Sequence, residues 1–270
     1  MHASTGHVAL LSAGIPLAIH VPSPAEGEKI ILGDAAALAS LSGPIEVRLA
    51  SEIPNKAFFD VSVRPLSNVS ATESKAIGQI IRSALEPSML LTKAPRTLVQ
   101  LVVQNLSSTK HLFWRDSFSA AMINASSLAI LNAASVPMRG VVLACAVGKL
   151  KDGTLVIDPE ESEDTEMTEG GCFAYLFADD VGGVSKAVCV WSAWRSRTGT
   201  YSQTGLVSAK EMGLQGSRLV YEKVRQYVSD PKLSKRSKET YIVVTGPPKE
   251  EQEASTDVDM DSEDDAEMVI

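Results

Sequence analysis

The amino-acid sequence predicts an α/β (α+β) domain in which mixed sheets pack against helices. The chain has 270 residues, of which 44% are apolar and 21% charged, as is usual for soluble globular proteins. Strand-like and helix-like patterns alternate along it: several strands, a helix, a strand, a helix, four strands and a last helix. We expect one domain over residues 1–246 and a disordered acidic tail over residues 247–270.

The first half of the chain begins with short apolar runs that predict a meander of strands: HVALL, PLAIHV, EKIIL and IEVRLA. In AFFDVSVRP, Phe59, Val61 and Val63 alternate with polar residues, which predicts a half-buried strand. SATE (70–73) has capping-box spacing for a helix. An apolar stripe that ends before Pro87 continues this helix: Ile77, Ile80, Ile81, Ala84 and Leu85.

The second half begins with a strand at TLVQLVVQ (97–104) and a helix from Ser117 to Ala134 that is apolar or small on nearly every face. VVLACAVG and TLVID form a hairpin around Asp152-Gly153, and CFAYLFA and KAVCVWSAW form a second strand pair. Ser208 and Glu211 have capping-box spacing for the last helix. Two glycines in that helix, Gly213 and Gly216, favour close packing against a neighbouring element.

The net charge of −8 is unevenly distributed. Residues 249–270 carry ten acids and one base, and the run 158–169 carries seven acids and no base. The rest of the chain therefore has a net charge of +8, which is compatible with a polyanionic partner. We expect the acidic run, inside a loop at 158–170, to be solvated.

The cysteines and histidines argue against metal and disulfide chemistry. Cys145, Cys172 and Cys189 lie in apolar surroundings without metal-ligand spacing, so we expect buried thiols in a reducing compartment. The four histidines are scattered, which supports neither a zinc site nor a histidine triad. No apolar run approaches the roughly 20 residues of a membrane span. We expect no cofactor and no membrane association.

Several segments together resemble the ribonuclease PH family, and in particular the small ribonuclease-PH-like subunits of the eukaryotic RNA exosome ring. They are GPIEVRLASEIPNKAFFDVSVRP, IIRSALEP, APRT, SFSAAMINASSLAILNAASVPMRG and DGTLVIDP. The resemblance covers about residues 33–228, and the first thirty residues and the acidic tail depart from it. It implies a ribonuclease PH-type domain of the ribosomal protein S5 domain 2-like fold.

The resemblance also implies where the catalytic groups should be. In active members a Gly-Thr/Ser-Arg-Thr/Ser-Ala turn at the start of the second helix holds phosphate, since an arginine binds phosphate oxygens bidentately. Here the arginine position is Phe118, and the flanking hydroxyls of Ser117 and Ser119 are those of an ordinary helix cap. We therefore expect a degenerate loop without phosphate-binding residues.

The catalytic acid of the family precedes the strand after the DP loop. The matching positions are Gly171 and Cys172, which supply no carboxylate. Glu169 is a possible displaced substitute, although a solvated acidic run is the favoured interpretation. We expect no catalytic residue and no enzymatic activity; the alternative is a phosphate-dependent 3′-to-5′ exoribonuclease with a rearranged active site.

Basic residues are the candidates for RNA contact: Arg82, Lys93, Arg96 and Arg115. Arg82 resembles a helix arginine that family enzymes direct toward phosphate, and the alternative is a surface or ion-paired arginine. Arg195 and Arg197 follow Trp191 and Trp194, but residues three apart on a strand lie on opposite faces, so we expect at least one tryptophan in the core or a subunit interface.

The partners implied by the resemblance are other ribonuclease PH-like exosome subunits, in a heterodimer within a six-membered ring, together with S1/KH cap subunits and RNA. The function implied for this chain is non-catalytic: it would support 3′-to-5′ RNA processing and degradation and contribute to the path of the RNA. The expected location is the nucleus, the nucleolus and the cytoplasm. KLSKRSK (232–238) is a candidate nuclear import signal.

Overall fold

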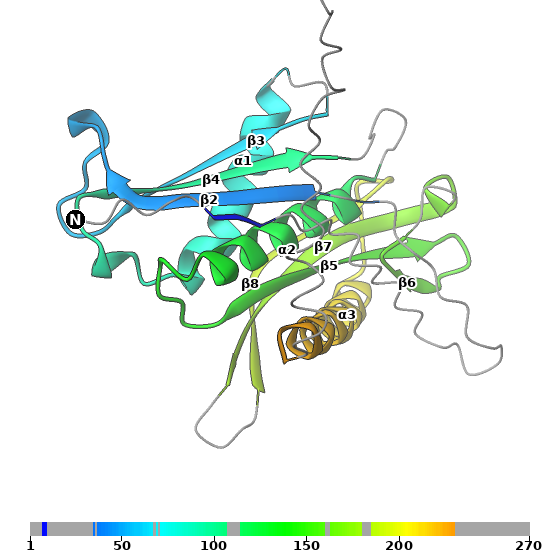
Figure 1. Ribbon diagram of the computed structural model, residues 1–270. Helices are drawn as coiled ribbons and strands as arrows, with labels where there is room; N and C mark the ends of the chain where they lie inside the picture. Colours follow the sequence, from blue (N-terminus) through cyan, green and yellow to red (C-terminus); the bar gives the residue numbers. More distant parts are fainter. Residues whose placement is uncertain are drawn as a thin grey trace, which may run out of the picture.

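The computed structural model describes residues 7–9, 35, 37–66, 69, 71–106, 114–159, 163–179 and 185–229. The predicted acidic tail and the candidate import signal lie outside these residues. In the described parts the elements follow the predicted order of strands and helices (Figure 1). Their bounds are β1 His7–Ala9, β2 Ala37–Glu46, β3 Phe58–Arg64, α1 Thr72–Leu85, β4 Thr97–Asn105, α2 Asp116–Ala133, β5 Val141–Leu150, β6 Leu155–Ile157, β7 Met167–Asp179, β8 Ser185–Ser196 and α3 Gln203–Ser229.

The first sheet has the strand order β1-β2-β4-β3 and is mixed. β2 is antiparallel to β1 and β4, whereas β3 and β4 are parallel because α1 connects them as a crossover. β2 runs through ALASLSGPIE, of which the predicted run IEVRLA covers only Ile45 and Glu46; that run ends in a short 3-10 turn, Leu49–Ser51, instead. The inward side chains of β2, Ala37, Ala39 and Leu41, are nonetheless at most 2% exposed. The predicted runs PLAIHV and EKIIL lie outside the described residues.

The second sheet has the order β6-β5-β7-β8 and is antiparallel throughout. Both predicted strand pairs are confirmed. On β5 and β7 both faces are buried, because helices cover the sheet on each side. Ala144 and Cys172 face α2, whereas Leu143 and Phe173 face α3.

Helix α2 is the central layer of the molecule, between the two sheets (Figure 1). Its residues Ile123, Ala125, Ala129 and Ile130 are all fully buried, which explains why the sequence is apolar on nearly every face. Asn124 fixes the helix to β5: its Nδ2 donates to the Ala144 carbonyl at 2.9 Å, and its Oδ1 accepts from the Ala144 amide at 2.7 Å.

Helix α3 packs on the outer face of the second sheet, and the prediction of close packing at its glycines is confirmed. A Cβ atom at Gly213 would lie 2.8 Å from the Phe173 ring, and one at Gly216 would overlap the Cys145 sulfur. Among the described residues, none of the helices combines the length and the apolar character that a membrane crossing requires.

The second capping-box prediction is wrong, whereas Ser70, the predicted cap of the first, lies outside the described residues. The described N-cap of α1 is Ala71, without a side-chain hydrogen bond, and Glu73 pairs with Arg115. Helix α3 begins five residues before Ser208, and the Ser202 hydroxyl accepts the Gly205 amide at 3.0 Å. The prediction of buried thiols holds for Cys145 and Cys172 but is wrong for Cys189, which is exposed on the edge strand β8.

Candidate functional site

The first turn of α2 is where a phosphate loop of the predicted kind would lie. Phe118 points into the main core and is 7% exposed. The prediction that the flanking serines cap the helix is wrong: Ser117 Oγ donates to the Pro159 carbonyl at 3.3 Å, and Ser119 Oγ donates back to the Arg115 carbonyl at 3.3 Å. The position of the binding arginine is therefore part of the core.

Carboxylates of the chain itself surround this helix end. Asp116, in the first turn of α2, is buried and accepts a hydrogen bond from Arg195 at 2.7 Å. Burial raises the pKa of Asp116, although Arg195 acts in the opposite direction. Burial also raises the pKa of Asp158 to about 6, with an opposing hydrogen bond from Ser117. Asp164 Oδ1 accepts the Trp114 amide at 2.8 Å.

The acidic run is therefore not simply a solvated loop, and that prediction is wrong for Asp164 and Glu169. Asp164 and Glu169 are only 9% and 8% exposed. Met167 to Glu169 already belong to β7, and the Arg197 guanidinium donates to the Asp164 carbonyl at 3.2 Å. The sequence pattern alone did not reveal that these acids contact the folded core.

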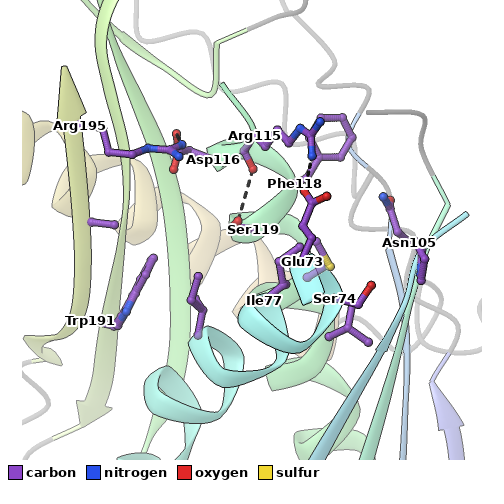
Figure 2. A pocket seen from close by; sticks show the side chains of 15 residues that line it. Glu73, Ser74, Ile77, Asn105, Arg115, Asp116, Phe118, Ser119, Trp191 and Arg195 are labelled. Carbon is purple, nitrogen blue, oxygen red and sulfur yellow. Dashed lines mark hydrogen bonds and ion pairs between the residues drawn. The ribbon is translucent and has the colours of Figure 1, made fainter. Parts of the chain in front are cut away.

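A cavity of about 370 Å³, which we call the α2 pocket, opens beside the first turn of α2. Its walls come from α1, α2, β8 and the ends of β3 and β4 (Figure 2). Four charged residues line it in two ion pairs, Arg115 with Glu73 and Arg195 with Asp116. Arg195 also lies 5.7 Å from the Trp114 ring centroid. The charges of the lining residues therefore compensate each other.

Glu169, the candidate substitute acid, lies on the other face of the second sheet. Its carboxylate accepts hydrogen bonds from Lys149 Nζ and Trp194 Nε1, each at 3.0 Å. Trp194 and Phe173 belong to the cluster under α3, and strand alternation places Glu169 on the same face as Phe173. The sheet itself therefore separates this carboxylate from the α2 pocket.

The two positions that match the family's acid also lack suitable chemistry. A side chain at Gly171 would overlap the Ala193 carbonyl of β8. Cys172 faces α2 but is fully buried, and burial raises the pKa of its thiol. In the described part of the chain no group of three His, Cys, Asp or Glu side chains is arranged to hold a metal ion.

Comparison with known proteins identifies this architecture. Residues 24–135 match the profile described as "3' exoribonuclease family, domain 1". The chain is 24% identical over 225 residues to the exosome complex component RRP46 of Saccharomyces cerevisiae, covering 82% of this chain and 96% of the relative. The crystal structure of rice (Oryza sativa) Rrp46 superposes with a TM-score of 0.62 at 22% identity, covering 74% of this chain and 86% of the other.

This chain has the fold of a ribonuclease PH domain. A further relative, the exosome complex component Rrp41 of Thermococcus gammatolerans, is 29% identical over 165 residues, or 59% of this chain. That match spans only 57% of the archaeal protein's length. The recognised fold is the predicted one, and α2 is the helix at which the domain's phosphate loop was expected.

The candidate RNA-contact residues of this ribonuclease PH domain fall into two groups. Arg115 borders the α2 pocket, beyond the carboxyl end of β4, whereas Arg82, Lys93 and Arg96 lie near the amino end of that strand. Because β4 has nine residues, about 30 Å of extended chain separates the two ends. The four candidates therefore do not form a single cluster.

The three candidates near the amino end of β4 differ from one another in their local contacts. Arg82 Nε lies 3.4 Å from Glu86, which also binds Lys56 at 2.8 Å, and the Arg82 guanidinium lies 5.6 Å from the Phe58 ring centroid. The hydrogen bond from Lys56 chiefly lowers the pKa of Glu86. Arg96 pairs with Glu52 at 3.3 Å with a side chain that is 69% exposed, and Lys93 is exposed.

The two tryptophans of the ribonuclease PH domain lie on opposite faces of β8, as predicted. Trp191 packs against the main core and lines the α2 pocket, whereas Trp194 packs under α3 beside Phe173 at a ring distance of 5.8 Å. The sequence reasoning missed Asp116, Ser74 and Arg195 as neighbours in this pocket. Nothing in the spacing of residues from three distant elements indicates such a meeting.

Proposed function

We propose that this chain is a non-catalytic subunit of the RNA exosome ring, which supports 3′-to-5′ RNA processing and degradation. The relatives that it resembles are named exosome complex components, and one of them matches over 82% of this chain. The observation that carries the non-catalytic part is Phe118, whose buried ring occupies the position expected for the phosphate-binding arginine.

The electrostatics of α2 support this part of the proposal. A phosphate ion at the helix N-terminus would meet the carboxyl groups of Asp116 and Asp158, whose negative charge would repel it when they are ionised. The two guanidinium groups that line the pocket at this helix end, those of Arg115 and Arg195, are engaged with Glu73 and Asp116. Loss of one preorganised donor costs about 3 to 4 kcal/mol of transition-state stabilisation, and here both the donor and the acid are missing.

The rival activity, phosphate-dependent exoribonuclease action through a rearranged site, needs an acid within reach of the same pocket. Glu169 was the candidate, but its carboxylate is held by Lys149 and Trp194 on the far face of the second sheet. For the Glu169 carboxylate to reach the α2 pocket, both hydrogen bonds would have to break. The side chain would also have to pass through a sheet whose residues are buried on both faces.

The proposed partners are other ribonuclease PH-like subunits, with which this chain would form a heterodimer inside a six-membered ring, and S1/KH cap subunits. Arg82, Lys93, Arg96 and Arg115 are proposed to contact an RNA backbone, a sequence-independent interaction that weakens with salt. The expected location, in nucleus, nucleolus and cytoplasm, is part of the same proposal.

Two measurements test the proposal. The tagged full chain should co-purify with five other ribonuclease PH-like chains, identified by mass spectrometry. The purified chain should release no nucleoside diphosphate from oligoadenylate in the presence of magnesium and inorganic phosphate. Release that disappears in Glu169→Gln would contradict the non-catalytic assignment, and isolation of the chain without such companions would contradict the ring assignment.

A further inference from the structure

The α2 pocket has an apolar floor, which is unusual for a place that would bind phosphate. Six large apolar residues of the lining, which we call its floor, come from β3, α1, α2 and β8: Val63, Ile77, Ile80, Phe118, Met122 and Trp191. Figure 2 labels Ile77, Phe118 and Trp191 among them. Phe118 and Met122 are already packed in the main core, so the floor is backed by close-packed side chains. A pocket of this composition favours an uncharged apolar group.

The Ser74 side chain supplies a polar group in the pocket to which a ligand could hydrogen-bond. Ser74 of α1 lines the cavity and is only 7% exposed. No hydrogen bond joins its hydroxyl to another described residue, and the side chain lies between Glu73 and Asn105 in Figure 2. The hydroxyl is not among the fully buried polar atoms without a partner in the described part of the chain, so it reaches the cavity, where an incoming carbonyl or amide group can bind it.

The charges near the pocket argue against an RNA backbone as the occupant. Glu73 and Asp116 line it, and Asp158 and Asp164 lie at the adjoining end of α2. The two arginines of the lining are paired with Glu73 and Asp116. A phosphodiester would have to compete with these carboxylates, whereas a neutral amide backbone would not.

Exposed apolar residues follow the lining residues in the sequence. Leu66 and Leu106 come directly after the lining residues Pro65 and Asn105, and they are 53% and 43% exposed. Val69, on the connection toward α1, is 74% exposed. Large apolar side chains left exposed near a cavity favour contact with protein over contact with a phosphodiester.

We propose that the α2 pocket binds one large apolar side chain of a partner protein segment, whose backbone amide group pairs with the Ser74 hydroxyl. The inference deepens the proposed function, because the site that would bind phosphate in an active ribonuclease PH domain becomes a protein contact here. A volume of about 370 Å³ accommodates one leucine- to phenylalanine-sized side chain together with the flanking backbone.

The test uses the full chain with labelled isoleucine and methionine methyl groups, observed by NMR. The probes are N-acetyl-leucinamide, N-acetyl-phenylalaninamide, N-acetyl-alaninamide, adenosine 5′-monophosphate and inorganic phosphate. The leucine and phenylalanine amides should shift the methyl signals of Ile77, Ile80 and Met122 saturably, with the weak affinity expected of such small ligands. The alanine amide should bind at least about tenfold more weakly, because it lacks most of the apolar side chain.

The matched variants are Ser74→Met and Ala76→Met, in the same turn of α1. Ala76 is exposed, so its variant should bind normally, whereas Met at position 74 should fill the pocket and weaken binding by about tenfold or more. Ser119→Met, which narrows the pocket from α2, replaces Ser74→Met if the latter does not give the native methyl spectrum.

Three outcomes would overturn the inference: stronger binding of the nucleotide or phosphate than of the leucine amide, equal binding of the leucine and alanine amides, or no shift with any probe. Failure of the pocket assignment can be distinguished from failure of the proposed function. A chain that co-purifies with ring subunits but binds no apolar amide refutes only the pocket assignment. A chain that binds the amides but has no ring companions refutes only the ring assignment.

Discussion

Replacement of Glu169 by alanine tests whether this acid is structural. Its side chain is 10% exposed and bridges Lys149 and Trp194 at 3.0 Å each. Breaking a buried ion pair costs about 3 to 5 kcal/mol. Because Lys149 is 27% exposed, water can solvate part of the remaining charge, so we expect Glu169→Ala to lower the free energy of unfolding by about 2 to 4 kcal/mol.

The same acidic run provides the matched control. Glu166 pairs with Lys151 at 3.4 Å, and both side chains are 60% exposed. Glu166→Ala should change the free energy of unfolding by about 0.5 kcal/mol or less, since exposed pairs contribute little. The distinction between the two acids therefore rests on burial and on the indole hydrogen bond to Glu169.

Urea unfolding of the full chain and both variants, followed by circular dichroism and tryptophan fluorescence, measures the difference. A Glu169→Ala effect no larger than that of Glu166→Ala would refute the structural role. So would unchanged stability combined with the loss of a phosphate-dependent nuclease activity, because that pattern belongs to a catalytic acid.

Four further substitutions probe the core, helix α3 and the α2 end. Phe118→Ala should destabilise the chain by about 3 to 5 kcal/mol, as for other buried aromatic residues, and a change under about 1 kcal/mol in urea melts would place this ring outside the core. Gly216→Ala should lower the free energy of unfolding by about 1 to 3 kcal/mol, because the added methyl group would meet Cys145. Ser208→Ala changes an exposed position inside α3 and should be neutral or slightly stabilising. A loss of about 1 kcal/mol at Ser208 would instead indicate a helix cap. Asp158 has a folded-state pKa of about 6, above its usual value, so its contribution to stability is present at low pH and is lost as the pH rises through about 6. Asp158→Asn should therefore raise the urea midpoint at pH 7.5 more than at pH 5, and an equal rise at both pH values would contradict the raised pKa.

The elements predicted best from sequence are those whose burial follows a simple period. β3 and β4 alternate, and α1 has a clear apolar stripe that ends at Pro87, so local residues were enough to define them. β2 was missed because four of its ten residues are alanine or serine, and such small residues give little contrast between its faces. Helix starts were misplaced because serine-to-glutamate spacing is common outside caps.

The candidate site depended on information that a linear sequence does not hold. The sequence shows that position 118 is not an arginine. It does not show which groups the neighbouring acids contact. Asp116 meets Arg195 across 79 positions of sequence. The face on which Glu169 lies depends on the register between β7 and β8, and one residue of slip would turn it toward α2.

The central position of α2 has a consequence for dissecting this protein into parts. The matched family profile ends at residue 135, two residues after the helix, which makes residues 1–135 look like a natural fragment. In such a fragment the first sheet would cover one side of α2, while Ala125, Leu128 and Ala129 would lose the neighbours that β5 and β7 supply. We expect the truncated polypeptide to precipitate or remain unfolded, since its central helix has no polar face that could be exposed to water.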